Sequence, residues 1–114
     1  MTDCIFCKIA AKKIPAKVIY EDDRAVAFED IAPQAPVHTL IIPKKHISTA
    51  LEITKEDHSL IGHLFQTAAK IAGDKGIDKK GFRLVMNTHA DAGQAVFHIH
   101  LHLLGGRAMH WPPG

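Results

Sequence analysis

Near the end of the chain, residues 98–104 form a run in which histidines alternate with large apolar residues. Alternation with a period of two predicts a half-buried β-strand, because successive side chains of a strand point to opposite faces of the sheet. The apolar side chains would face the core: Ile99, Leu101 and Leu103. The imidazoles would form a row on the other face: His98, His100 and His102. Neighbouring imidazoles each need polar partners and are costly to protonate together, so we expect the row to serve chemistry.

The composition is that of an ordinary globular protein. The chain has 114 residues, of which 46% are hydrophobic and 23% charged, and this predicts a single domain over residues 1–114. A net charge of +2 is too small for a nucleic-acid-binding surface, and no apolar run approaches the roughly 20 residues that span a bilayer. The first residues lack the basic and apolar regions of a signal peptide, and the two cysteines suit a reducing compartment. We therefore predict a cytoplasmic location with no nucleic-acid or membrane partner.

The remaining patterns predict an α+β fold. A short helix is expected over residues 4–11, and a long amphipathic helix follows Thr54, with apolar residues at three- and four-residue spacing. Further strands are expected at residues 17–21, 25–29, 37–42 and 82–87. Residues 88–94 are expected to form a polar loop, and His58 and His63 of the long helix are expected to face solvent. Short connections favour antiparallel neighbours, with the helices on one side of the sheet.

Three functions remain open for the histidine row when only the residues are considered. The imidazoles could be solvated polar groups on an exposed face of the sheet. They could hold a catalytic metal ion, since two histidines of one strand and a third ligand leave an open position on Zn²⁺. They could also supply a nucleophile and proton donors, because a neutral imidazole can attack phosphorus. The spacing alone does not choose between the metal site and the nucleophile.

The run matches the His-φ-His-φ-His-φ-φ motif, where φ is apolar, and the chain therefore resembles the histidine triad (HIT) superfamily. The resemblance extends through further segments: residues 14–17, 28–31, 33–36, His38, residues 42–47, 105–107 and 111–114. The Gly-Gly-Arg and Trp-Pro-Pro-Gly segments are similar to those of the branch called histidine triad nucleotide-binding proteins, which are purine nucleoside phosphoramidases. The resemblance implies a HIT-like five-stranded antiparallel sheet with one long and one short helix, extended across a homodimer.

The resemblance also implies an activity. The substrate would be an adenosine or other purine nucleoside 5′-phosphoramidate, whose P–N bond is cleaved to AMP and an amine without a cofactor. His100 would be the nucleophile and carry a nucleotidyl intermediate, which divides one difficult displacement into two steps. His102 would contact the phosphate and help to protonate the leaving amine, with His98 and His38 as the polar network behind. An adenylated lysine of a partner protein is a second implied substrate.

Nucleotide contacts follow from the same resemblance. Asp30 would accept both ribose hydroxyls, Ile31 would contact the base, and Phe28 would line the purine slot. Contacts on the phosphate side would come from Asn87, Gly93 and Gln94. The family usually has a phosphate-binding serine where this chain has Ala95. Losing one hydrogen bond to an anion costs about 1.5–3 kcal/mol, so we predict an altered transition-state contact, offset by a water or by the Gln94 side chain, with activity retained.

Cys4 and Cys7 form a C-x-x-C pair, which is half of a structural zinc site. His46 and His98 are the candidate remaining ligands, since some HIT proteins carry zinc on such a Cys, Cys, His, His set and others in the branch carry none. The alternative is a pair of reduced thiols that pack a short helix. The sequence leaves a structural zinc ion and free thiols both open.

Other functions are compatible with the same sequence. Dinucleoside polyphosphate hydrolysis is the neighbouring activity within the enzyme class, and the tail favours the phosphoramidase by resemblance. A non-catalytic nucleotide-binding or interaction module would keep the pocket without turnover, although an intact His100 argues against it. A zinc-dependent hydrolase would hold its metal with the triad itself and would lose activity in a chelator.

Overall fold

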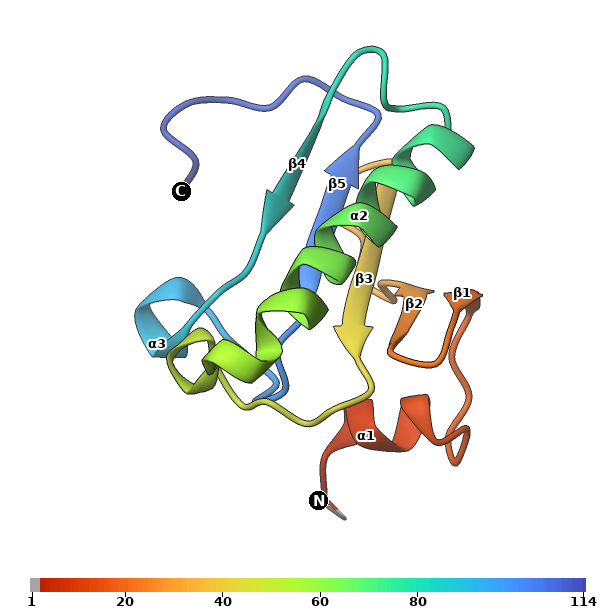
Figure 1. Cartoon of the computed structure of the whole chain (residues 1–114). Coiled ribbons are helices and arrows are strands. Elements are labelled where there is room, and N and C mark those ends of the chain that lie inside the picture. Colours follow the sequence, from red (N-terminus) through yellow and green to blue (C-terminus); the bar gives the residue numbers. More distant parts are fainter. Residues whose placement is uncertain (1–2) are drawn as a thin grey trace.

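The computed structural model describes residues 3–114, so the first two residues of the segment considered as a signal peptide lie outside the described residues. Figure 1 shows an α+β molecule built on a five-stranded sheet in the order β1-β2-β3-β5-β4. All neighbouring strands are antiparallel. The strands are β1 (Val18–Glu21), β2 (Ala25–Glu29), β3 (Val37–Pro43), β4 (Phe82–Val85) and β5 (Leu101–Gly105). The predicted fold class is confirmed.

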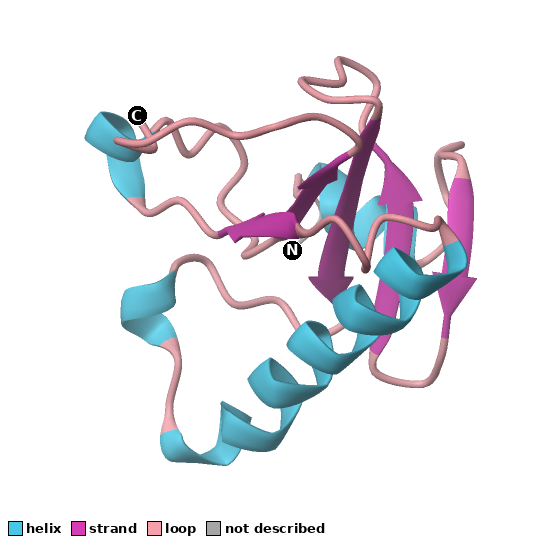
Figure 2. Cartoon of the chain, turned by 90° about the horizontal axis from the view of Figure 1, so that it is seen from above, coloured by secondary structure: helices cyan, strands magenta, loops and turns pink. Residues whose placement is uncertain are grey.

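The long helix α2 (His58–Asp74) lies along one face of the sheet (Figure 2), where it contacts β3 and β5. Thr54 and Asp57 form a capping box before it, around a short 3₁₀ turn at Lys55–Asp57. Such a box satisfies amides that the first helical turn leaves without partners. The apolar stripe of the helix is buried against the sheet: Leu64, Ala68, Ile71 and Ala72. The amphipathic helix predicted after Thr54 is therefore present.

The short helix α1 (Ile5–Ala10) packs on the opposite face, so the expectation that the helices share one side of the sheet is wrong. Alternate residues of β2 and β3 belong to the cluster under α2: Ala25, Ala27 and Ile41. The residues between them pack with Phe6 and Ile9 of α1: Val26, Phe28, Leu40 and Ile42. Two central strands that are apolar on both faces need cover on both.

The histidine strand is shorter than predicted. β5 begins at Leu101, and the segment from His98 to His100 precedes it outside the sheet ladder. β3 ends at Pro43, which has no N–H to donate, and the amide of Ile99 donates instead to the Ile47 carbonyl at 2.7 Å. Alternate apolar residues are still buried through the segment: Ile99, Leu101 and Leu103. The solvated-row alternative is wrong, because His98 and His100 are themselves buried.

Two further regions differ from the prediction. Residues 88–94 contain a short helix, α3 (His89–Ala92), which ends at Gly93 with a φ of +83° that favours glycine. His63 is half-buried rather than solvent-facing, and its Nε2 lies 2.6 Å from Asp22 Oδ2, which ties the β1–β2 turn to α2. Within the described residues, no helix combines the length and the apolar character needed to cross a membrane.

Candidate active site

Imidazoles from two neighbouring strands meet on one face of the sheet. β3 and β5 pair with Leu40 opposite His102 and with His38 opposite Leu104, so His38 and His102 are diagonal neighbours. Their ring centroids are 5.1 Å apart, and the His102 ring centroid is 4.9 Å from that of His100. The structure thus brings three of the predicted catalytic histidines into contact.

The backbone determines which nitrogen of His100 carries a proton. Its Nδ1 lies 2.9 Å from the His98 carbonyl, which can only accept, so Nδ1–H is the donor and Nε2 keeps its lone pair. Burial lowers the pKa of His100, although the hydrogen bond to the His98 carbonyl opposes this change. The Phe6 ring packs edge-on against the His100 imidazole, with the two ring centroids 5.1 Å apart. At pH 7, His100 is therefore a neutral imidazole with a lone pair at Nε2.

A backbone amide determines the protonation of His38 and, through it, of His102. Gln34 N–H donates to His38 Nδ1 at 3.0 Å, so the neutral His38 ring carries its proton on Nε2. That Nε2 lies 2.9 Å from His102 Nδ1, which must then accept. Burial lowers the pKa of His102 to about 4, and the nearby His100 and His38 add to the effect. The neutral His102 ring therefore carries its proton on Nε2, the nitrogen remote from His38.

Asp30 lies beside His38 and His102, and one of its carboxylate oxygens accepts a hydrogen bond within its own loop. Its Oδ1 accepts the Ala32 amide at 2.7 Å, and its Oδ2 lies 3.4 Å from His38 Nε2. The carboxylate that we predicted to take both ribose hydroxyls therefore offers Oδ2 as its freer oxygen.

Asp30, His38 and His102 have donor atoms within 4.8 Å of one another, which is close enough for a metal ion. However, His38 already accepts the Gln34 amide at Nδ1, so the neutral ring has a proton rather than a lone pair at Nε2. His100 directs Nδ1 to a carbonyl, and His98 directs Nδ1 to the cysteines. These hydrogen bonds do not fit the alternative in which the triad itself binds a catalytic zinc ion.

An apolar cavity of about 600 Å³ lies beside the histidines. Phe6, which contacts His100, forms part of its wall. The lining includes four of the predicted nucleotide contacts: Phe28, Asp30, Ile31 and Ala95. It also includes Leu40, which was not among the predicted contacts. Leu40 follows His38 by two residues in a strand and so shares its face, which could have indicated it. The size and the lining of the cavity suit a small-molecule ligand with a flat apolar part.

The three residues predicted on the phosphate side do not line this cavity: Asn87, Gly93 and Gln94. Gln94 is buried, and its side-chain amide is engaged at both ends. Its Oε1 accepts the His89 amide at 2.9 Å, and its Nε2 donates to the carbonyls of Ser48 and Val96 at 2.8 and 3.1 Å. The suggestion that this side chain replaces the missing serine hydroxyl is therefore wrong, because it holds the loop around α3.

A second cluster gathers Cys4 and Cys7 with His46 and His98. His98 Nδ1 lies 3.3 Å from Cys4 Sγ, 3.5 Å from Cys7 Sγ and 3.2 Å from His46 Nδ1. A zinc tetrahedron of two sulfurs and two nitrogens has edges of roughly 3.3–3.8 Å at the usual bond lengths. His98 Nε2 lies 2.8 Å from the Pro43 carbonyl, which makes Nε2–H the donor and leaves the Nδ1 lone pair for a metal. The donor set and its spacing fit a tetrahedral zinc ion.

The fold and the grouped histidines are those of a histidine triad protein, and the model of the HIT domain family matches residues 11–109. The chain belongs to the HIT domain family. It is 48% identical over 107 residues to the purine nucleoside phosphoramidase of Escherichia coli, with 94% of this chain and 90% of that protein covered. It is 50% identical over 114 residues to a 14 kDa zinc-binding protein of Brassica juncea, with 98% and 100% covered. The crystal structure of a HIT family hydrolase from Legionella pneumophila matches with a TM-score of 0.97, 53% identity and coverage of 98% and 100%.

Proposed function

We propose that the chain hydrolyses purine nucleoside 5′-phosphoramidates with His100 as the nucleophile. The observation that supports this is the anchored imidazole: the His98 carbonyl holds Nδ1–H and leaves Nε2 free near the apolar cavity. Similarity to the E. coli purine nucleoside phosphoramidase supports the choice of substrate. Attack of Nε2 on the α-phosphorus breaks the P–N bond and forms a nucleotidyl-histidine, which water hydrolyses to AMP.

The other residues divide the remaining tasks. His102, with its proton on Nε2, donates toward the phosphate and the leaving amine, which must gain a proton as it departs. In the second step the oxygen of water bonds to phosphorus, the bond from phosphorus to His100 Nε2 breaks, and a proton of the water returns to His102 Nε2. Asp30 accepts a ribose hydroxyl, and Phe28 and Ile31 hold the base in the cavity. Asn87 and Gly93 contact the phosphate side, and Ala95 leaves one phosphate oxygen without a hydroxyl donor.

Intact-mass spectrometry after rapid mixing with adenosine 5′-phosphoramidate tests this proposal, provided that the quench avoids acid, since phosphohistidine is acid-labile. We expect an AMP adduct on the wild-type protein and none on His100→Ala. His58→Ala removes an exposed imidazole on α2 and is the matched control, which should form the adduct as the wild type does. Hydrolysis without an adduct that stops in a chelator would contradict the mechanism.

The same assay separates the neighbouring functions. A dinucleoside polyphosphate hydrolase would form the adduct faster from a diadenosine polyphosphate than from the phosphoramidate. A binding module would bind AMP in calorimetry and show no adduct with either compound. An adenylated-lysine peptide as substrate tests the proposal that a modified partner protein is processed.

We propose a structural zinc ion on Cys4, Cys7, His46 and His98. The fit of the donor set supports it, as does the similarity to a relative named as a zinc-binding protein. The ion would join α1 to the loop after β3 and to the segment before β5, and no catalytic step passes through it. Metal analysis of protein refolded with zinc should give one zinc ion per wild-type chain and none for Cys7→Ser; an apo wild type would refute the site.

We also propose a homodimer that continues the sheet. Among the described residues β4 pairs only with β5, so its outer edge is free for a second copy. The tail runs beside β4 (Figure 1), and Arg83 donates to the His110 carbonyl at 3.1 Å while Trp111 stays 82% exposed. Sedimentation equilibrium should give twice the chain mass, and Leu84→Pro in β4 should give a monomer.

The cytoplasmic location stays a prediction, tested by cell fractionation.

A further inference from the structure

The Gly-Gly-Arg segment at the end of β5 lies against the loop of residues 33–36 before β3. Gly106 has a φ of +90°, and a Cβ at this position would come within 2.9 Å of Pro36 Cβ. Only glycine allows the two segments to approach this closely without a shift of the proline. The segment that follows the histidine strand is therefore shaped to contact the loop that carries Gln34.

Arg107 makes this contact specific. Its Nε and Nη2 lie 3.2 and 3.0 Å from the Gln34 carbonyl, and its Nη1 lies 3.1 Å from the Ala108 carbonyl. Two N–H groups of one rigid guanidinium thus hold a single backbone oxygen. The Arg107 side chain is exposed, so its orientation comes from these hydrogen bonds and not from burial in the core.

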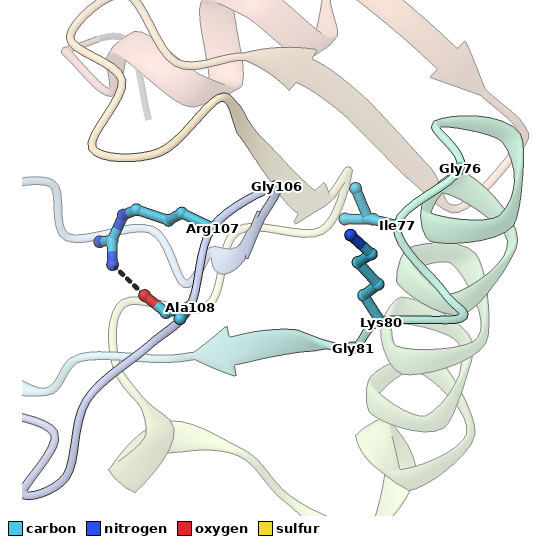
Figure 3. A pocket seen from close by; sticks show the side chains of 7 residues that line it. All are labelled: Gly76, Ile77, Lys80, Gly81, Gly106, Arg107 and Ala108. Atoms are coloured by element: carbon cyan, nitrogen blue, oxygen red, sulfur yellow. Dashed lines mark hydrogen bonds between the residues drawn. The ribbon is translucent and has the colours of Figure 1, made fainter.

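A cavity of about 510 Å³ borders the same segment, and Gly106, Arg107 and Ala108 form part of its lining. Figure 3 shows the Arg107 side chain extending away from Ile77 and Lys80, which line the opposite part of the cavity, and bonded to the Ala108 carbonyl. The guanidinium is therefore directed to the loop backbone, and the cavity by itself gives no reason for an arginine at this position.

Gln34 connects Arg107 to the catalytic histidines. The residue whose carbonyl Arg107 holds also donates its amide to His38 Nδ1 at 3.0 Å. The other end of the loop is braced as well, because Gln34 Nε2 donates to the Ala32 carbonyl at 3.0 Å and Asp30 Oδ1 accepts the Ala32 amide. Arg107 thus holds the peptide group that follows Gln34, while the Gln34 side chain and Asp30 hold the backbone of Ala32.

The pair of neutral rings, His38 and His102, can be protonated in two ways. With the amide at His38 Nδ1, His38 donates from Nε2 and His102 presents Nε2–H to the substrate. Without the amide, His38 is free to carry its proton on Nδ1 and to accept at Nε2 from His102 Nδ1–H. His102 would then present a lone pair, which repels a phosphate oxygen. A partner at one nitrogen decides the tautomer of a neutral imidazole, and here that partner is the Gln34 amide.

We propose that Arg107 is a positioning residue for proton donation: by holding Gln34 it keeps the amide on His38 and the proton of His102 on Nε2. The kinetic part of this proposal rests on the proposed phosphoramidase function, whereas the tautomer part concerns the free protein. It assigns a task to the Gly-Gly-Arg segment that neither the nucleophile nor the cavity accounts for.

The first test reads the tautomers directly. Long-range ¹H–¹⁵N spectra of ¹⁵N-histidine-labelled protein distinguish a protonated from an unprotonated ring nitrogen at His38 and His102. We expect Nε2–H on both rings in the wild type and a mixture of tautomers in Arg107→Ala. Arg107→Lys keeps a donor for the Gln34 carbonyl and should restore much of the wild-type pattern. Lys80→Ala, which removes a basic side chain across the cavity, is the matched control and should change nothing.

The second test uses the proton requirement of the leaving group. An alkylamine needs a proton as it leaves AMP, whereas 4-nitrophenolate does not. General acid catalysis contributes about 10²–10⁴-fold, so we expect Arg107→Ala to lower kcat for the alkyl phosphoramidate about tenfold. It should leave kcat for adenosine 5′-(4-nitrophenyl phosphate) within about twofold of the wild type, with KM for both substrates little changed.

Equal losses on both substrates, or an unchanged tautomer pattern in Arg107→Ala, would overturn the proposal. If the alanine variant does not fold, Arg107→Gln keeps one N–H donor, and its intermediate tautomer pattern takes the place of the alanine result; an unchanged pattern in it counts against the proposal in the same way. If the wild type turns over neither compound, the proposed function fails while the spectra still decide whether Arg107 sets the tautomers.

Discussion

The two halves of the active site hold their histidines in opposite ways. On one side the carbonyls of Pro43 and His98 accept from His98 Nε2–H and His100 Nδ1–H, so each ring turns a lone pair outward. On the other side the Gln34 amide donates to His38, which leaves a proton rather than a lone pair on the far nitrogen of His102. The carbonyl anchors thus leave lone pairs on the proposed zinc ligand and the proposed nucleophile, and the amide anchor leaves a proton on the proposed proton donor. The same side chain acquires different chemistry from its backbone partner.

The largest expected effect in this comparison comes from removing His100, the carbonyl-anchored ring that we propose as the nucleophile. His100→Ala should lower kcat/KM for adenosine phosphoramidate by about 10⁴-fold or more, as the loss of a nucleophile does in other covalent enzymes. AMP affinity, measured by calorimetry, should change much less, because the cavity is lined largely by other elements. A residual activity within a hundredfold of the wild type would show that His100 is not the nucleophile.

The second prediction concerns the other carbonyl-anchored ring, His98. If its Nδ1 lone pair binds zinc, a chelator should lower the free energy of unfolding by about 3 kcal/mol, the effect of a ligand at a hundred times its dissociation constant. Thermal unfolding with and without chelator measures the change, and Cys7→Ser should show no response to chelator. AMP-adduct formation should persist at low temperature in the metal-free protein. Its disappearance would mean that the two carbonyl-anchored rings are not independent.

The third prediction adds a hydrogen-bond donor to the lining of the apolar cavity. Ala95→Ser places a hydroxyl at the rim of the cavity, and one hydrogen bond to a phosphate oxygen is worth about 1.5–3 kcal/mol. We expect kcat/KM to rise roughly tenfold or more. Ala95→Cys has nearly the shape of serine with a weak donor, and it should stay close to the wild type. An equal gain in both variants would assign the effect to packing rather than to the hydrogen bond.

The smallest effect is on stability in acid. The pKa of His102 in the folded chain, about 4, lies below the value of 6.5 for a free imidazole. The unfolded chain therefore takes up a proton at a higher pH, and stability falls as the pH drops from about 6.5 toward 4. His102→Gln should remove on the order of 1 kcal/mol of this loss of stability. The rest of the loss should remain, because burial also lowers the pKa of His98 and of His100. Urea unfolding at several pH values measures how the free energy of unfolding depends on pH. His58→Gln, at an exposed position, should leave that dependence unchanged.

The sequence pattern predicted the parts of the fold that depend on local periodicity. The spacing of apolar residues after Thr54 indicated α2, and the alternation around His102 indicated which residues are buried in and before β5. The extent of β5 was wrong, because it depends on where β3 ends at Pro43 and on the Ile47 carbonyl that takes the Ile99 amide. The position of α1 was also missed, because β2 and β3 are apolar on both faces and this pattern does not indicate which helix covers which face.

The candidate site shows the same division. The sequence pointed to the cysteines, the histidines and Asp30, because these residue types carry recognisable chemistry. It did not point to Gln34, whose contribution comes from a backbone amide that every non-proline residue has. It also misjudged Gln94, whose side chain holds three backbone groups around α3.

The residue pattern indicated which side chains carry chemistry: three histidines that alternate with apolar residues, and a C-x-x-C pair. Which nitrogen of each ring holds a proton and which holds a lone pair depends on contacts that form only in the folded chain. The physical reason is that an imidazole offers two nearly equivalent nitrogens, and a single hydrogen bond selects between them. The selecting groups come from distant parts of the chain, the Pro43 carbonyl for His98 and the Gln34 amide for His38 and, through it, His102.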